Sequence, residues 1–153
     1  MKTPRPNPGE RGSVMVEFTL SLLVLIPLFL GGWAFGYTFY QYARLESAVR
    51  AGARYASTLN YNSASATPSA AFLSAVQNMT VYGDPNANPS TATPLVSGLT
   101  TGNVNLNVGF TNSAPSSMTV SITGFNVLTY FGTTTLSGKP YVWFPYVGYW
   151  TPP

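Results

Sequence analysis

The longest uncharged stretch of the chain constrains its fold more than any other feature. No charged residue occurs between Phe18 and Ala43, and most of the residues between them are apolar. About 20 apolar residues suffice to cross a bilayer as a helix. The apolar part of a cleaved secretory signal is shorter, at about 7–15 residues. The stretch therefore predicts a transmembrane helix over about residues 18–40, in which Pro27 is tolerated.

The same helix is expected to continue beyond the membrane. Good helix formers extend to about Ser57, and Glu46 and Arg50 have the spacing of a favourable i,i+4 ion pair. A helix from Val14 to Ser57 would be roughly 66 Å long at 1.5 Å per residue. Because one bilayer requires far less, we expect the remainder to pack with other helices.

Small residues spaced four apart line this helix in two stripes. Gly32 and Gly36 form one stripe within the membrane segment, and Ala48, Gly52 and Ala56 form the other. Small residues let helices approach closely, although Gly is also common in membrane helices. The two stripes on one helix predict helix-on-helix packing.

The composition argues against catalysis. The chain has no Cys and no His, and charged residues make up only 7% of it, against roughly 25% in a typical domain. The usual ligands of zinc and the usual general base are therefore missing. Beyond position 12 the only acidic residues are Glu17, Glu46 and Asp84, and Asp84 has no carboxylate partner for acid–base work. We expect a non-enzyme that binds neither a cofactor nor a metal.

All basic residues except Lys139 flank the apolar stretch, on both sides. The positive-inside rule consequently does not decide the orientation, but the Thr-, Ser- and Asn-rich remainder favours export with the N-terminus in the cytoplasm. A net charge of +3 without a clustered basic face disfavours nucleic acid as a partner. A nucleic-acid-binding role would rest on Arg44, Arg50 and Arg54. Arg50 and Arg54 share one face of the helix, but Glu46 lies on the same side.

One carboxylate stands where the apolar helix begins. A polar leader, Met1–Gly12, ends in Gly; Ser13 follows, and Glu17 is the fifth residue counted from Ser13. A carboxylate in a membrane helix costs up to about 2.5–3.5 kcal/mol at the bilayer centre and less at its edge. Glu17 could complement the helix dipole, or an ammonium group could pair with it and offset the cost.

The leader and the start of the helix resemble the processing site of type IV pilin-like proteins. Residues 11–57 further resemble the TadE-like family, the pseudopilins of tight-adherence (Tad) pilus systems. The features that carry the resemblance are Gly12 before the cut, Glu17 followed by Phe18, Pro27, and the continuation "RAGARYAS". The major pilins usually carry Tyr in place of Phe18 and are short, so the long remainder favours the minor type.

The resemblance implies a function, a set of partners and a location. A prepilin peptidase would cut after Gly12, and Glu17 would meet the free amine of Ser13 in a neighbouring subunit. The chain would be a minor pilin or pseudopilin, a structural subunit of a Tad-type pilus for surface adhesion, with other pilins and the assembly platform as partners. It would lie in the bacterial inner membrane before assembly and in an extracytoplasmic pilus afterwards. The alternative is an unprocessed single-pass protein with an exported ligand- or surface-binding domain.

The remainder predicts a small domain, which makes the fold α+β. After the long helix at residues 13–57, residues 58–102 are expected to form a short helix and loops. Thr67 and Pro68 are typical of an N-cap and a first helical residue. The residues predicted to share one face of that helix are Phe72, Val76 and Met79.

Residues 103–153 are expected to form an antiparallel β-sheet. Apolar residues alternate with Asn, Ser and Thr along two stretches, which predicts two strands joined as a loose hairpin. The inward residues would be Val104, Leu106, Val108 and Phe110 in the first strand, and Met118, Val120 and Ile122 in the second. A third strand is expected within 126–136 and a fourth around 139–144.

The chain ends in the aromatic segment "YVWFPYVGYW" at 141–150. Its rings could close the sheet core and pack on the helix. They could instead form a surface for adhesion, a partner pilin or sugar stacking, or a membrane-interface belt. The candidate contact residues are Trp143, Tyr146, Tyr149 and Trp150.

Overall fold

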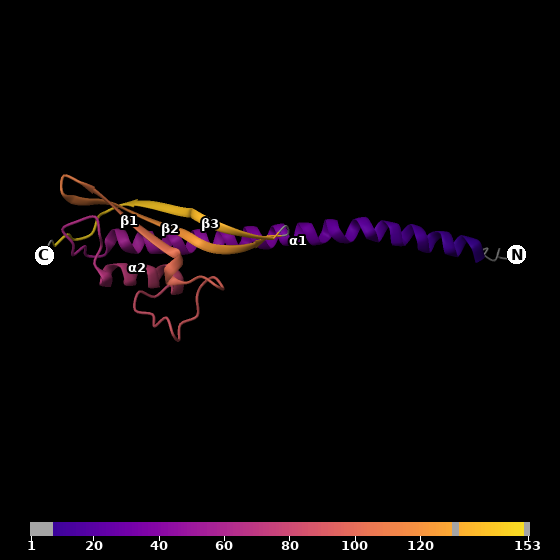
Figure 1. The fold of residues 1–153 in the computed structure, drawn as a ribbon, viewed down its shortest axis with the longest axis horizontal. Coiled ribbons are helices and arrows are strands. Elements are labelled where there is room, and N and C mark those ends of the chain that lie inside the picture. Colours follow the sequence, from indigo (N-terminus) through magenta and orange to yellow (C-terminus); the bar gives the residue numbers. More distant parts are fainter. Residues whose placement is uncertain (1–7, 130–131, 152–153) are drawn as a thin grey trace, which may run out of the picture. The chain divides into compact units, whose positions relative to one another are not determined.

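The computed structural model describes residues 8–129 and 132–151. The chain divides into two compact units, Met1–Tyr37 and Thr38–Pro153. In order along the chain, the elements are α1 (Pro8–Thr58), α2 (Ala70–Tyr82), a short 3-10 helix η1 (Thr101–Asn103), β1 (Val104–Thr111), β2 (Ala114–Thr129) and β3 (Gly132–Pro145) (Figure 1). The α+β fold class, with one long and one short helix and an antiparallel sheet, is confirmed.

Helix α1 begins at Pro8 rather than at Ser13. Proline suits the first position of a helix because its φ is already helical and its missing N–H has no partner there. Pro27 lies inside the helix. The helix ends at Thr58, where the hydroxyls of Ser57 and Thr58 bond back to carbonyls of the preceding turn. The expected end, near Ser57, is therefore correct to one residue.

Helix α2 begins two residues later than predicted. Ser69, not Thr67, is the N-cap, and its hydroxyl accepts a hydrogen bond from the backbone nitrogen of Phe72. Thr67 is instead held in a local turn by the hydroxyls of Ser63 and Ser65. Gly83 ends the helix with a φ of 77°, a left-handed conformation that glycine adopts readily. The helix buries Phe72 and Val76 as expected, whereas Met79 is only partly buried.

The three strands form one antiparallel sheet in the order β1-β2-β3 (Figure 1). The first two strands pair with Leu106 opposite Val120 and Val108 opposite Met118, so the predicted alternation is confirmed. Their connection is tight rather than loose. Only Asn112 and Ser113 separate the strands, with φ values of 53° and 62°, as a two-residue hairpin turn requires.

The prediction of separate third and fourth strands is wrong. Residues 126–129 belong to β2, and the single strand β3 spans Gly132–Pro145. The gap that the sequence indicated at Ser137 and Gly138 is a shift in register, since Thr123 pairs with Ser137 while Ser121 pairs with Tyr141. Strand β3 lies at the sheet edge, where Pro140 removes no hydrogen bond that the sheet needs.

The core of the second unit lies between one face of the sheet, α2, and the part of α1 beyond Tyr37. Helix α1 contributes four fully buried residues, Leu45, Val49, Ala53 and Ala56. The sheet contributes the inward rows Leu106–Val120–Val142 and Val108–Met118–Phe144. Tyr61, which is fully buried, joins them at the end of α1. This unit therefore has a hydrophobic core of its own.

Candidate functional site

The predicted processing site lies on an exposed, uninterrupted stretch of α1. Gly12, Ser13, Glu17 and Phe18 are all helical and exposed, while residues 1–7 of the predicted leader lie outside the described residues. Because four residues make about one turn, Ser13 and Glu17 share a face of the helix. Among the residues that the structure describes, none forms an ion pair with Glu17. Its carboxylate is therefore available to a group from outside the chain.

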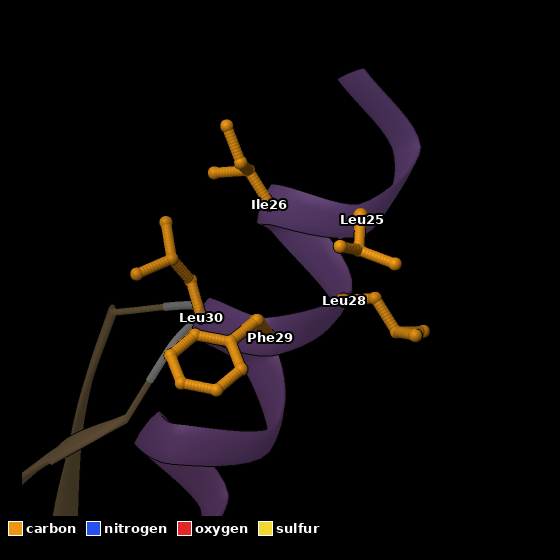
Figure 2. Close-up of a pocket in the computed structure, with 5 residues that line it drawn as sticks. All are labelled: Leu25, Ile26, Leu28, Phe29 and Leu30. Carbon is orange, nitrogen blue, oxygen red and sulfur yellow. The ribbon is translucent and has the colours of Figure 1, made fainter. Parts of the chain in front are cut away.

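The helix around this site presents apolar side chains outward. Within the described part of the chain, one helix, Gly12–Thr58, is long and apolar enough to cross a membrane. Figure 2 shows five of its side chains, which project outward from the helix and line a shallow hollow: Leu25, Ile26, Leu28, Phe29 and Leu30. None of them carries a polar group that could orient a small ligand. The hollow is therefore lined by apolar side chains alone.

The two stripes of small residues differ in their surroundings. Gly32 and Gly36 are exposed, and a Cβ added at either one would meet no atom within 4 Å. Ala48, Gly52 and Ala56 are buried. A Cβ added at Gly52 would lie 1.9 Å from the hydroxyl oxygen of Thr80 in α2. The second stripe therefore packs within one chain, and the first is open.

The aromatic C-terminal segment divides into outward and inward rings. Tyr141 and Trp143 are about three-fifths exposed, at 60% and 57%, and Tyr149 is 83% exposed. Tyr146 and Trp150 are half-buried and pack against the core. The indole nitrogen of Trp150 donates to the carbonyl oxygen of Ser63 at 3.0 Å. Of the four candidate contact residues, Trp143 and Tyr149 thus face solvent, while Tyr146 and Trp150 hold the fold together.

The Tyr146 hydroxyl links three segments, a role that the sequence did not indicate. It accepts a hydrogen bond from the backbone nitrogen of Tyr61 at 2.9 Å, and its proton can be donated to the carbonyl oxygen of Leu59 at 2.9 Å or of Tyr149 at 2.5 Å. The Tyr61 and Tyr146 rings meet edge to face, with centroids 6.3 Å apart. Burial raises the pKa of both phenols above their ordinary value.

Two arginines of α1, Arg44 and Arg50, are each engaged by a side chain one turn away. Arg50 pairs with Glu46 at 2.6 Å, and both side chains are largely exposed, so the pair stabilises the helix only slightly. Arg44 donates to the hydroxyl of Tyr40 at 3.1 Å and lies over its ring. In the part of the chain that the structure describes, no three acidic residues gather where a metal ion could bind.

Comparison with protein families gives a match in the N-terminal helix, which contains the predicted processing site. Residues 12–54 match the family model of TadE-like protein. The match confirms the resemblance predicted from the sequence. The TadE-like segment contains Gly12, Ser13, Glu17, both exposed glycines and Gly52 of the buried stripe, and it ends before Ala56. Neither a curated protein nor a solved structure gives a match.

Some candidate sites lie inside the TadE-like segment, and others lie in the rest of the chain. The proposed processing and assembly residues all lie inside the match. Helix α2, the sheet and the aromatic segment lie outside it. The match thus gives a context for the N-terminal motif, whereas the outward aromatic residues have to be understood from their geometry.

Proposed function

We propose that this chain is a minor pilin-like subunit of a Tad-type pilus, with a structural rather than a catalytic role. The observation that carries the proposal is the coincidence of the TadE-like match at residues 12–54 with an exposed apolar helix and a glutamate at position 17. The apolar helix supports an anchor that crosses the inner membrane once. The Thr-, Ser- and Asn-rich remainder favours an orientation with the N-terminus in the cytoplasm. The second unit would then lie outside the cell membrane.

Processing by a prepilin peptidase after Gly12 is part of the proposal. In the structure the bond between Gly12 and Ser13 lies within α1. A peptidase needs an extended substrate, so the first turns of the helix have to unwind locally. Glycine is a poor helix former, by about 1 kcal/mol relative to alanine, and both Gly9 and Gly12 lie in these turns. These two glycines therefore lower the cost of unwinding near the proposed cut.

Assembly would use the carboxylate of Glu17. After cleavage the new amine of Ser13 is a cation at the end of an apolar helix, and Glu17 is an anion one turn further on. Each charge is costly inside lipid and less costly when paired. A pair between Ser13 of one subunit and Glu17 of the next would fix the axial register of two helices. The open stripe at Gly32 and Gly36 would allow those helices to approach closely.

The test compares two glutamates of α1. We expect Glu17→Ala to remove the chain from filaments sheared off the cell surface while leaving its amount in the membrane unchanged. Glu46→Ala is the matched control, because Glu46 lies on the same helix and its carboxylate pairs with Arg50 of the same chain. This variant should enter filaments normally. Normal incorporation of Glu17→Ala would contradict the proposed role of Glu17.

One observation favours the alternative, an unprocessed single-pass anchor for an exported domain. Helix α1 continues through Gly12 and Ser13 without a break, and an uncleaved anchor needs no unwinding. This alternative keeps residues 1–12 on the protein and gives Glu17 only the role of a charge near a helix end. It differs from the proposed function in the N-terminus of the mature protein.

A further inference from the structure

The outer face of the sheet, which is turned away from the core, carries two rows of aligned side chains. Asn105 pairs with Ser121, and Ser121 pairs with Tyr141; one step along, Asn107 pairs with Thr119, and Thr119 pairs with Trp143. Side chains directly opposite on neighbouring strands lie about 5 Å apart. We call these six residues the outer face. Each row consists of an amide, a hydroxyl and an aromatic ring, in that order across the sheet.

The core does not account for the two rings. Side chains alternate between the faces of a strand, and β3 uses Val142 and Phe144 for the core. Tyr141 lies just before Val142, and Trp143 lies between Val142 and Phe144. Their surfaces are 60% and 57% exposed, respectively. Threonine or serine would suit these exposed positions, as in the neighbouring strand. Two large rings facing solvent on the same strand therefore indicate a binding surface.

The rings lie beside polar groups that have unused hydrogen-bonding capacity. Within the described residues, no side-chain hydrogen bond engages Asn105, Asn107, Thr119 or Ser121. Two amides and two hydroxyls offer both donors and acceptors. The rings are two residues apart along β3, or about 7 Å, so one extended ligand can lie over both and reach the polar groups across the strands.

The absence of ionisable groups among the six residues of the outer face restricts the class of ligand. None of its six residues is ionisable at neutral pH, so it offers no complement to phosphate, nucleic acid or an acidic peptide. A stable protein interface would have an apolar centre, whereas two of the three strands here present amides and hydroxyls. A neutral sugar polymer matches the face, because its rings have apolar sides for stacking and its rim carries hydroxyl groups.

We propose that the outer face binds a neutral polysaccharide. Sugar rings stack on Tyr141 and Trp143, and their hydroxyl groups bond to the side chains of the adjacent strands. Binding needs only the folded second unit and does not depend on cleavage after Gly12 or on entry into a pilus. The surface is the part of the molecule that would hold a cell to a sugar-coated support.

The test is co-sedimentation of the purified full chain with three insoluble neutral polysaccharides: cellulose, chitin and starch. The protein is kept in lauryldimethylamine oxide, since a detergent with a sugar head group would compete for the site. We expect retention on at least one polymer, unchanged between about 0.1 M and about 1 M salt because no charge is involved. Trp143→Ala should weaken that retention roughly tenfold, and Tyr141→Ala should weaken it as well.

Two control variants separate binding from folding. Tyr149→Ala removes the most exposed ring of the segment, which lies outside β3, and should bind normally. Trp143→Phe keeps a ring at the site and should retain most of the binding. Failure to bind all three polymers would overturn the proposal. Equal retention of Trp143→Ala and the unchanged chain would also overturn it. A third contradicting result is Trp143-dependent binding to uncharged phosphatidylcholine vesicles, or to a second copy of the chain, without any binding to sugar.

Discussion

The hydroxyl of Tyr146 lies 2.9 Å from the backbone nitrogen of Tyr61, and this contact ties the C-terminal segment to the end of α1. Neighbouring backbone bonds strengthen the connection: the nitrogen of Val147 donates to the carbonyl of Ser57, and that of Thr151 donates to the carbonyl of Tyr61. The residues from Tyr146 to Thr151 therefore close the second unit, and Tyr146 supplies the central side-chain contact.

Tyr146→Phe tests this connection with a minimal change. The variant keeps the ring but removes the oxygen that serves the Tyr61 nitrogen and the Leu59 carbonyl. The Leu59 carbonyl loses this donor, whereas the Tyr61 nitrogen keeps its hydrogen bond to the Tyr149 carbonyl at 2.8 Å. We therefore expect the free energy of unfolding to fall by about 1 kcal/mol, the usual contribution of a hydrogen bond. Urea unfolding followed by circular dichroism in detergent measures it. Tyr149→Phe, at an exposed position, should change the same quantity by less than about 0.5 kcal/mol; equal effects would refute the assignment.

Alkaline pH should destabilise the second unit. Burial raises the pKa of Tyr61 and Tyr146 in the folded chain above the ordinary value of 10.0. Above pH 10 the unfolded chain loses these protons while the folded chain keeps them, so the free energy of unfolding falls as pH rises. This contribution is complete below pH 10 and is lost as pH passes through the raised values. Unfolding midpoints measured on either side of pH 10 should show the fall, and Tyr146→Phe should make it shallower.

The two stripes of small residues should respond differently to alanine. A Cβ at Gly52 would collide with the hydroxyl of Thr80, which is buried and bonded to the carbonyl of Val76. Overpacking of this kind costs about 1–3 kcal/mol, which outweighs the roughly 1 kcal/mol that alanine gains in a helix. Unfolding of Gly52→Ala in urea should therefore begin at lower denaturant concentration.

A second variant and a control make the comparison specific. Thr80→Ala removes the colliding oxygen and should restore part of the stability lost in Gly52→Ala, which a double-mutant cycle measures. Gly36→Ala meets no atom within 4 Å and should leave the unfolding midpoint unchanged or slightly raised. A loss of stability in Gly36→Ala equal to that in Gly52→Ala would contradict the distinction between the stripes.

The sequence predicted those features that depend on local pattern. The long helix follows from the uncharged stretch after Phe18, and the two faces of β1 and β2 follow from strict alternation. The continuous β3 was not predictable, because Gly138 and Pro140 indicate a break unless the strand is known to lie at a sheet edge. The start of α2 was misplaced for a similar reason, since Thr67 and Ser69 are both good N-caps.

The candidate site was predictable only in part. Gly12, Glu17 and Phe18 are candidates from the sequence because their spacing forms a motif. The different surroundings of Gly36 and Gly52 could not be found, since both stripes have the same spacing and only the fold places α2 against one of them. The role of Tyr146 depends on Tyr61, which lies 85 residues away in the sequence, and no local pattern records that contact.

The central claim is that this chain is a processed pilin-like subunit, and its N-terminus tests it most directly. Intact-mass and N-terminal peptide analysis would be carried out on the protein from its own cells, with and without the prepilin peptidase. We expect a chain that begins at Ser13 when the peptidase is present and keeps Met1–Gly12 when it is absent. A chain that keeps residues 1–12 in both cells would contradict the account and leave an unprocessed membrane anchor.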